Sequence, residues 1–258
     1  MKKLLPILFV LIITSCSPPP EVPSYQLVER DGVYYEVNSQ TGFTGTSISY
    51  YENGQLKEKI TYTNGELDGS IESYFENGQL QLKGNYKNGE VDGLNKSYYE
   101  NGQLEITKTY KNGKEDGLNE RYFKNGQLLF KGTYKEGELD GFNEVYFENG
   151  QLTFKGSYKD GVHVDGPYNL YYENGQLELK GNYNNGEFNG TYESYYENGQ
   201  LKSKGNMIGG KYNGLWDFVI PDDEMNKFRI QEIHHENGFT ETKYCYQKDE
   251  IVDMSFCD

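Results

Sequence analysis

The sequence predicts an all-β protein, an elongated single-layer antiparallel meander of tandem β-hairpin repeats. The first observation is a motif of two aromatics followed by x-Asn-Gly-Gln-Leu, which begins at residues 50, 74, 98, 122, 146, 171 and 195. Its spacing is 24 residues, once 25, and such a fixed period is the signature of a repeat array. The second observation is composition. The 258 residues include no alanine, one proline between residues 46 and 214, and 15% aromatics, which favours strands over helices.

The N-terminus predicts export and a lipid anchor. An apolar run over residues 4–13 follows two lysines, is too short to span a bilayer, and is typical of a secretory signal peptide over residues 1–15. Residues 13–16, Ile-Thr-Ser-Cys, resemble the bacterial lipobox, which implies cleavage before Cys16 and attachment of the lipid to that cysteine. Ser17 implies, by the same resemblance, the outer membrane of the cell envelope. The alternative is an ordinary signal peptide.

Flanking segments are predicted at both ends of the repeats. Residues 16–24 contain four prolines and are expected to form an extended tether, and residues 25–45 a cap hairpin that turns at Asp31-Gly32. Residues 46–214 hold the seven repeats. Residues 215–258 are predicted to be a C-terminal cap, in which HHENGF, from His234, is a degenerate repeat. Within it, Cys245 and Cys257 are expected either to form a disulfide or to remain two unpaired buried thiols.

Each repeat is predicted to be one hairpin. Asn-Gly between runs of aromatic and β-branched residues predicts a two-residue type I′ turn. In the third repeat, a turn at Asn101-Gly102 places Tyr99 opposite Leu104 and Lys96 opposite Thr107. In four other repeats the same register pairs opposite charges: Glu72 with Lys83, Glu120 with Lys131, Glu144 with Lys155, and Glu193 with Lys204. In the third repeat both positions differ, with Lys96 in place of the glutamate and Thr107 in place of the lysine, and this paired change supports the register. The alternative is that lysine and glutamate simply populate a hydrated face.

Alternation along the strands separates two faces. One is predicted to be apolar, with the second aromatic of each motif opposite the final leucine, and a tyrosine six residues further on. Neighbouring tyrosines are expected to cover the sheet where this face carries a glycine: Gly84, Gly132, Gly156, Gly181 and Gly205.

The other face is predicted to be amphipathic and hydrated. It carries the glutamates, the lysines and the first tyrosine of each motif, for which the sequence indicates no role in folding. These tyrosines are the candidate binding residues: Tyr50, Tyr74, Tyr98, Tyr122, Tyr146, Tyr171 and Tyr195.

The whole repeat resembles a known family. A glycine, a strand ending in two aromatics, x-Asn-Gly-Gln-Leu, Gly-x-Tyr and x-Asn-Gly-x-x-Asp-Gly is similar to the MORN repeat over about residues 42–220. The form is that of the bacterial variant in antitoxins of the YwqK type. The resemblance implies a sheet of hairpins that serves as a scaffold or binding surface, and a toxin-neutralising role. The lipobox departs from a cytoplasmic antitoxin and moves such a role to the envelope.

No catalytic residue, metal site or cofactor is predicted. His234 and His235 are adjacent and point to opposite sides of a strand, and His163 is isolated. A net charge of −15 disfavours nucleic acid and anionic lipid, which leaves Cys16 as the membrane attachment. We expect a non-enzymatic, lipid-anchored envelope protein whose sheet binds another protein, with glycan or peptidoglycan binding through the tyrosines as the alternative and a passive spacer as the third. The sequence specifies neither the partner nor the oligomeric state.

Overall fold

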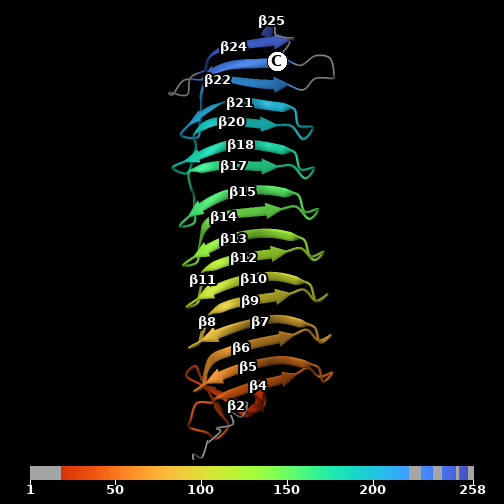
Figure 1. The fold of residues 1–258 in the computed structure, drawn as a ribbon, viewed down its shortest axis with the longest axis vertical. Helices are drawn as coiled ribbons and strands as arrows, with labels where there is room; N and C mark the ends of the chain where they lie inside the picture. Colours follow the sequence, from red (N-terminus) through yellow and green to blue (C-terminus); the bar gives the residue numbers. More distant parts are fainter. Residues whose placement is uncertain (1–18, 221–227, 235–239, 248–249, 255–258) are drawn as a thin grey trace, which may run out of the picture.

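The computed structural model describes residues 19–220, 228–234, 240–247 and 250–254 and forms one long antiparallel sheet, a single layer thick (Figure 1). The strands lie across the long axis and follow one another in chain order, which confirms the predicted all-β meander. Within the described ranges, no helix is long and apolar enough to cross a membrane. The predicted signal peptide and Cys16 lie outside these ranges.

The repeats contain fourteen long strands, in agreement with two per motif. They are β4 (Gly45–Tyr50), β5 (Leu56–Thr63), β6 (Glu66–Tyr74), β7 (Leu80–Lys87), β9 (Gly93–Tyr98), β10 (Leu104–Lys111), β12 (Gly117–Tyr122), β13 (Leu128–Lys135), β14 (Glu138–Tyr146), β15 (Leu152–Lys159), β17 (Gly166–Tyr171), β18 (Leu177–Asn184), β20 (Gly190–Tyr195) and β21 (Leu201–Ile208). Four short strands precede some of them: β8 (Glu90–Val91), β11 (Lys114–Glu115), β16 (Val162–His163) and β19 (Glu187–Phe188).

Further elements extend the array at both ends. The N-terminal ones are β1 (Glu21–Pro23), the short 3-10 helix η1 (Ser24–Gln26), β2 (Leu27–Arg30) and β3 (Val33–Glu36). The C-terminal ones are β22 (Lys211–Ile220), β23 (Phe228–His234), β24 (Thr240–Gln247) and β25 (Glu250–Val252).

The segment predicted as an N-terminal cap covers one end of the first repeat. Strands β2 and β3 form a separate hairpin that turns at Asp31 and Gly32, and β1 pairs in parallel with β4 at the edge of the long sheet. The ring of Tyr34 lies 4.8 Å from that of Tyr62, and Phe43 is buried beside them. This hairpin therefore buries aromatic surface that no preceding repeat covers.

The hairpin tips differ from the prediction. In the third repeat, the Gly102 N–H donates to the Tyr99 carbonyl and the Tyr99 N–H donates to the Gln103 carbonyl, both at 2.8 Å. Of the three loop residues, Glu100, Asn101 and Gly102, only Gly102 has a positive φ, at +83°. This is a three-residue loop built on a type I turn, so the predicted two-residue type I′ turn at Asn101-Gly102 is wrong.

A β-bulge restores the register after each tip. Tyr98 pairs with Leu104, the ladder shifts at Glu105, and Lys96 then lies opposite Thr107 as predicted. The extra residue of the loop is thus absorbed by the extra residue of the bulge. The prediction that Tyr99 lies opposite Leu104 is wrong, because directly paired residues share a face and the leucine lies with the first tyrosine.

The type I′ turns lie at the opposite ends of the hairpins. Asn64 and Gly65 both have positive φ values, +52° and +86°, between paired Thr63 and Glu66. The chain thus uses Asn-Gly for two different turns, one along each long edge of the sheet (Figure 1).

The prediction that tyrosines of neighbouring strands cover the glycines of the apolar face is wrong, because other side chains lie nearest to all five glycines. A Cβ added to Gly132 would lie 2.7 Å from the Phe130 ring, and one added to Gly205 would lie 2.3 Å from the Trp216 indole. Phe154 and Phe188 lie in the same way over Gly156 and Gly181, and the Asn95 amide lies over Gly84. Aromatic rings can therefore lie flat on a sheet that has no second layer.

Candidate binding surface

A row of mostly charged residues crosses the hydrated face from β5 to β22. In strand order it reads Lys59, Glu72, Lys83, Lys96, Thr107, Glu120, Lys131, Glu144, Lys155, Asn169, Lys180, Glu193, Lys204 and Asp217. The four predicted cross-strand pairs are ion pairs with N–O distances of 2.7–3.2 Å. Lys96 interrupts the alternation and lies beside Lys83, a like charge.

The candidate tyrosines lie at the ends of the strands on this face, each opposite a leucine. Four of them have a glutamate two residues earlier, and their hydroxyls donate to its carboxylate at 2.7–2.8 Å: Tyr74, Tyr122, Tyr146 and Tyr195. The same glutamates accept from the cross-strand lysines, so these tyrosines do have a role in folding, which the sequence reasoning missed. Tyr50, Tyr98 and Tyr171 follow Ile48, Lys96 and Asn169 instead, and Tyr50 is 58% exposed.

These hydrogen bonds predict a loss of stability in alkali. Burial, and after it the bond to Glu120, raises the pKa of Tyr122 to about 12, and the pKa values of Tyr74 and Tyr146 are also raised to about 12. Since the folded state retains the phenolic proton above the ordinary pKa of 10.0, this stabilisation is complete below pH 10 and is lost as the pH rises to about 12. We expect Glu120→Gln to lower the Tyr122 pKa, measured by NMR titration of ring-labelled tyrosine. An unchanged titration in that variant, with Glu148→Gln as control, would contradict this assignment.

The rest of the motif joins each hairpin tip to the next. The Asn53 amide donates to the Glu76 carbonyl at 3.0 Å while its oxygen accepts from the Gln55 N–H. The second aromatic, where it is tyrosine, donates to a backbone carbonyl of the next repeat, as Tyr51 does to Tyr74 at 2.7 Å. The first interaction recurs along the tips, so the asparagine is needed both for the turn and for the contact between repeats.

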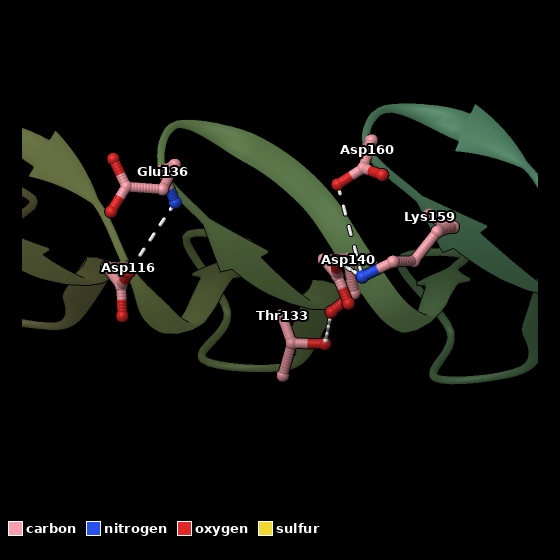
Figure 2. A network of polar contacts seen from close by, with 6 residues as sticks. All are labelled: Asp116, Thr133, Glu136, Asp140, Lys159 and Asp160. Carbon is pink, nitrogen blue, oxygen red and sulfur yellow. Dashed lines mark hydrogen bonds and ion pairs between the residues drawn. The ribbon is translucent and has the colours of Figure 1, made fainter.

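The opposite edge is joined by acidic residues. Figure 2 shows Asp116 accepting from the backbone N–H of Glu136, one turn further along the sheet. At the next turn Asp140 instead pairs with the Lys159 ammonium, and its carbonyl accepts from Thr133. The Asp116 carboxylate thus contacts the following turn of this edge, while the Asp140 carboxylate pairs with a lysine of its own hairpin, β14 and β15, and its backbone carbonyl contacts β13 of the preceding one.

Three exposed apolar side chains lie at the centre of the hydrated face, and the sequence reasoning missed them. They are Leu94, Leu118 and Phe142, which are 46%, 38% and 63% exposed and follow the glycine that begins each of three consecutive repeats. The flanking repeats have Thr46, Ser70, Pro167 and Thr191 at this position. Comparison of the repeats at the glycine-plus-one position would have identified the three residues.

A charged cluster interrupts the apolar face in the same region. The Lys108 ammonium pairs with Glu115, and the Asn119 amide, almost fully buried, donates to Glu115 at 2.6 Å. In the next repeat the positions of Lys108 and Glu115 hold Gly132 and Leu139. A search for paired changes between repeats, like the one at Lys96 and Thr107, would also have identified Lys108 and Glu115 as a pair.

The remaining predicted residues show no catalytic arrangement. His163 lies among aromatic rings, with Tyr183 at 4.4 Å and Tyr158 at 5.0 Å, and burial lowers its pKa. Cys245 is fully buried and disulfide-bonded, so the alternative of two unpaired thiols is wrong. Cys257, its partner in the other alternative, lies outside the described residues, as does His235. No group of three or more metal-ligating side chains occurs in the described part of the chain.

Comparison with known proteins places the repeats in a family. The model of the MORN repeat variant matches seven segments: residues 43–64, 67–88, 91–112, 115–136, 139–160, 164–185 and 188–208. No curated relative matches the sequence. A solved structure, described as the crystal structure of TcdB2-TccC3, aligns at 11% identity and a TM-score of 0.23, over 88% of this chain and 15% of that one. The present chain thus spans a small part of that protein, and so low a score supports no conclusion about function. Because the seven matched segments make up more than half of its length, the chain belongs to the MORN repeat variant family.

Proposed function

We propose that the chain is a non-catalytic, lipid-anchored envelope protein whose hydrated face binds another protein, as a scaffold or as a toxin-neutralising partner. The observation that carries this proposal is the apolar trio, which we define as Leu94, Leu118 and Phe142. Exposed apolar groups rimmed by charge are typical of protein interfaces, and nothing in the fold requires them, because other repeats place small polar residues or proline there.

The surroundings of the trio fit a protein partner. Its members lie on alternate strands, β9, β12 and β14, and span about 19 Å at ~4.8 Å per strand. Tyr98, Tyr122 and Tyr146 lie at the ends of the same strands, with the charged row between them and the trio. Exposed apolar side chains beside charged residues and tyrosines are common in protein interfaces.

The anchor is supported by the lipobox-like residues 13–16 and the proline-rich segment that follows. In this arrangement Cys16 carries the lipid, in the outer membrane. The predicted tether is shortened to the residues before β1, because Glu21–Pro23 already pair with β4 of the sheet. Labelling cells with a fatty-acid analogue tests this directly. Cys16→Ser should remove the label and release the protein, and label that persists would refute the anchor.

The binding surface is tested by replacing the trio with the threonine of the flanking repeats. We expect Leu94→Thr/Leu118→Thr/Phe142→Thr to weaken binding of the partner at least tenfold, with little effect on stability, because all three side chains are exposed and two other repeats carry threonine at this position. The partner is identified by crosslinking in cells from a photoreactive residue at Tyr122, and its affinity is then measured with purified proteins.

Val162→Thr is the matched control, since it removes another exposed apolar group, 62% exposed, at the edge of the sheet. Equal affinity of the triple variant and the control would contradict the proposal. Retention on isolated cell wall that is lost in Tyr98→Ala/Tyr122→Ala/Tyr146→Ala, without any protein crosslink, would instead assign the face to glycan binding.

A further inference from the structure

A hollow of about 260 Å³ lies on the apolar face near the C-terminal end of the array, over β18, β20, β21 and β22. Its lining includes four aromatic side chains, Tyr172, Tyr192, Tyr212 and Phe218, and a fifth aromatic residue, Tyr195, whose hydroxyl donates to Glu193 on the hydrated face. Ser194 and Ser203, paired across β20 and β21 with their hydroxyl oxygens 2.7 Å apart, also line it.

The sequence explains why this hollow exists. Ser194 and Ser203 belong to a row of the apolar face that holds large side chains in the central repeats: Phe130, Val145, Phe154, Leu170 and Leu179. Where two serines replace them, the space above the sheet is left unfilled, and the surrounding aromatic residues become its walls. A second hollow, of about 580 Å³, lies on the same face over β6, β7, β9 and β10, where this row holds Ser73 and Ser97.

Two opposite charges lie at the hollow. Glu178, the bulge residue of β18, lines it, and within the described part of the chain its carboxylate has no hydrogen-bond or ion-pair partner. Burial, and after it the charge of Glu178, raises the pKa of Tyr172, so the carboxylate acts on the aromatic wall. Lys202 also lines the hollow, with its ammonium 5.6 Å from the centroid of the Tyr196 ring.

We propose that this hollow binds a small zwitterion with a methylated ammonium group, of which phosphocholine is the simplest probe. Aromatic rings with an adjacent carboxylate recognise quaternary ammonium groups through the negative faces of the rings. The ammonium lies among the four rings beside Glu178, and the anionic end lies toward Lys202. This site is on the face opposite the apolar trio, so the tests of ligand binding here and of protein binding at the trio can give different outcomes.

The only tryptophan of the chain reports on this site. Trp216 lies 4.0 Å from Tyr212, 5.6 Å from Tyr192 and 5.8 Å from Phe218, measured between ring centroids. We expect its fluorescence to change saturably when phosphocholine is added to the full-length mature protein in a polyoxyethylene detergent. Choline, which lacks the anion, should bind about tenfold more weakly, and the neutral isostere 3,3-dimethylbutan-1-ol should not bind. Equal binding of the isostere, stronger binding of a methyl glucoside, or no response to either ammonium compound would overturn the proposal.

Single substitutions test the roles of Glu178 and Lys202 separately. Glu178→Gln should weaken phosphocholine binding at least tenfold, and Lys202→Gln should abolish the preference for phosphocholine over choline. Glu148→Gln, at the exposed tip of the fifth repeat, makes the same change in net charge and should leave binding unaltered. Sedimentation with phosphatidylcholine vesicles, but not phosphatidylglycerol vesicles, would show that the ligand is borne by a lipid, and binding of soluble phosphocholine alone would show that it is free. Equal affinities of the Glu178 and Glu148 variants would refute the site.

Discussion

Replacing Trp216 with alanine is expected to lower the free energy of unfolding of the C-terminal part of the array by about 3–5 kcal/mol. Trp216 is fully buried, which is unusual in a sheet one layer thick. Its indole lies over Gly205, where an added Cβ would be 2.3 Å away, and its N–H donates to the Asn206 carbonyl at 2.9 Å. Tyr192 and Tyr212 pack against the ring, so alanine would leave a cavity that the sheet cannot close.

The measurement must resolve one part of the array. Each repeat contacts only its neighbours, so unfolding need not be two-state, and a global midpoint would mix several transitions. Amide hydrogen exchange in β20–β22 reports the local free energy directly. Trp216→Phe keeps a ring over Gly205 and should lose less than half as much. Equal protection of those strands in the wild-type protein and the alanine variant would show that the indole does not hold this end together.

Much of the fold followed from comparing the repeats with one another. The period, the two strands per motif, the charged row and the opposition of Lys96 and Thr107 were predicted correctly, since each depends on spacing or on paired changes within the chain. The tip was not predicted, because Asn-Gly favours a type I′ turn locally and the chain uses that turn only at the other edge. At the tip, the asparagine side chain bonds to the next repeat, which no property of a single hairpin reveals.

The candidate site was predicted less completely. The first tyrosine of each motif was placed on the correct face, but the bond that four of the seven make to the glutamate two residues earlier was missed, although both residues lie on one face of one strand. The leucine was assigned to the wrong face because a three-residue loop reverses the alternation until the bulge restores it. The trio arises at a position that varies between repeats, and the hollow depends on Ser203, where the six preceding repeats hold larger side chains, so neither was visible in a search for what the repeats share.

The pair of Lys108 and Glu115 gives the second large effect. Glu115→Leu alone is expected to lower the local free energy of unfolding by about 2–4 kcal/mol. The two charged side chains are only 23% and 21% exposed, and removing the carboxylate leaves the lysine unpaired on the apolar face. Asn119 also loses the acceptor for its buried amide. We place the loss below that of a fully buried pair because water still reaches both groups.

Restoring the common repeat should recover most of this loss. Lys108→Gly together with Glu115→Leu reproduces the arrangement of Gly132 and Leu139 in the next repeat, and should lie within about 1 kcal/mol of the wild-type protein, because a buried ion pair contributes little net stability compared with apolar side chains. That arrangement tolerates a buried asparagine, since the side-chain oxygen of Asn143 has no hydrogen-bond partner.

Hydrogen exchange in β10 and β12 of the wild-type protein, both single variants and the double variant gives the coupling energy. If the double variant is as unstable as Glu115→Leu, glycine and leucine cannot replace the ion pair of Lys108 and Glu115, and the charges themselves are needed for the stability of this repeat. If it recovers, each repeat contributes an independent layer whose covering is set by pairs of residues on adjacent strands. The apolar face can then vary from repeat to repeat at almost no cost in stability, and this freedom permits hollows lined with serine in some repeats and a charged cluster in another on a single continuous sheet.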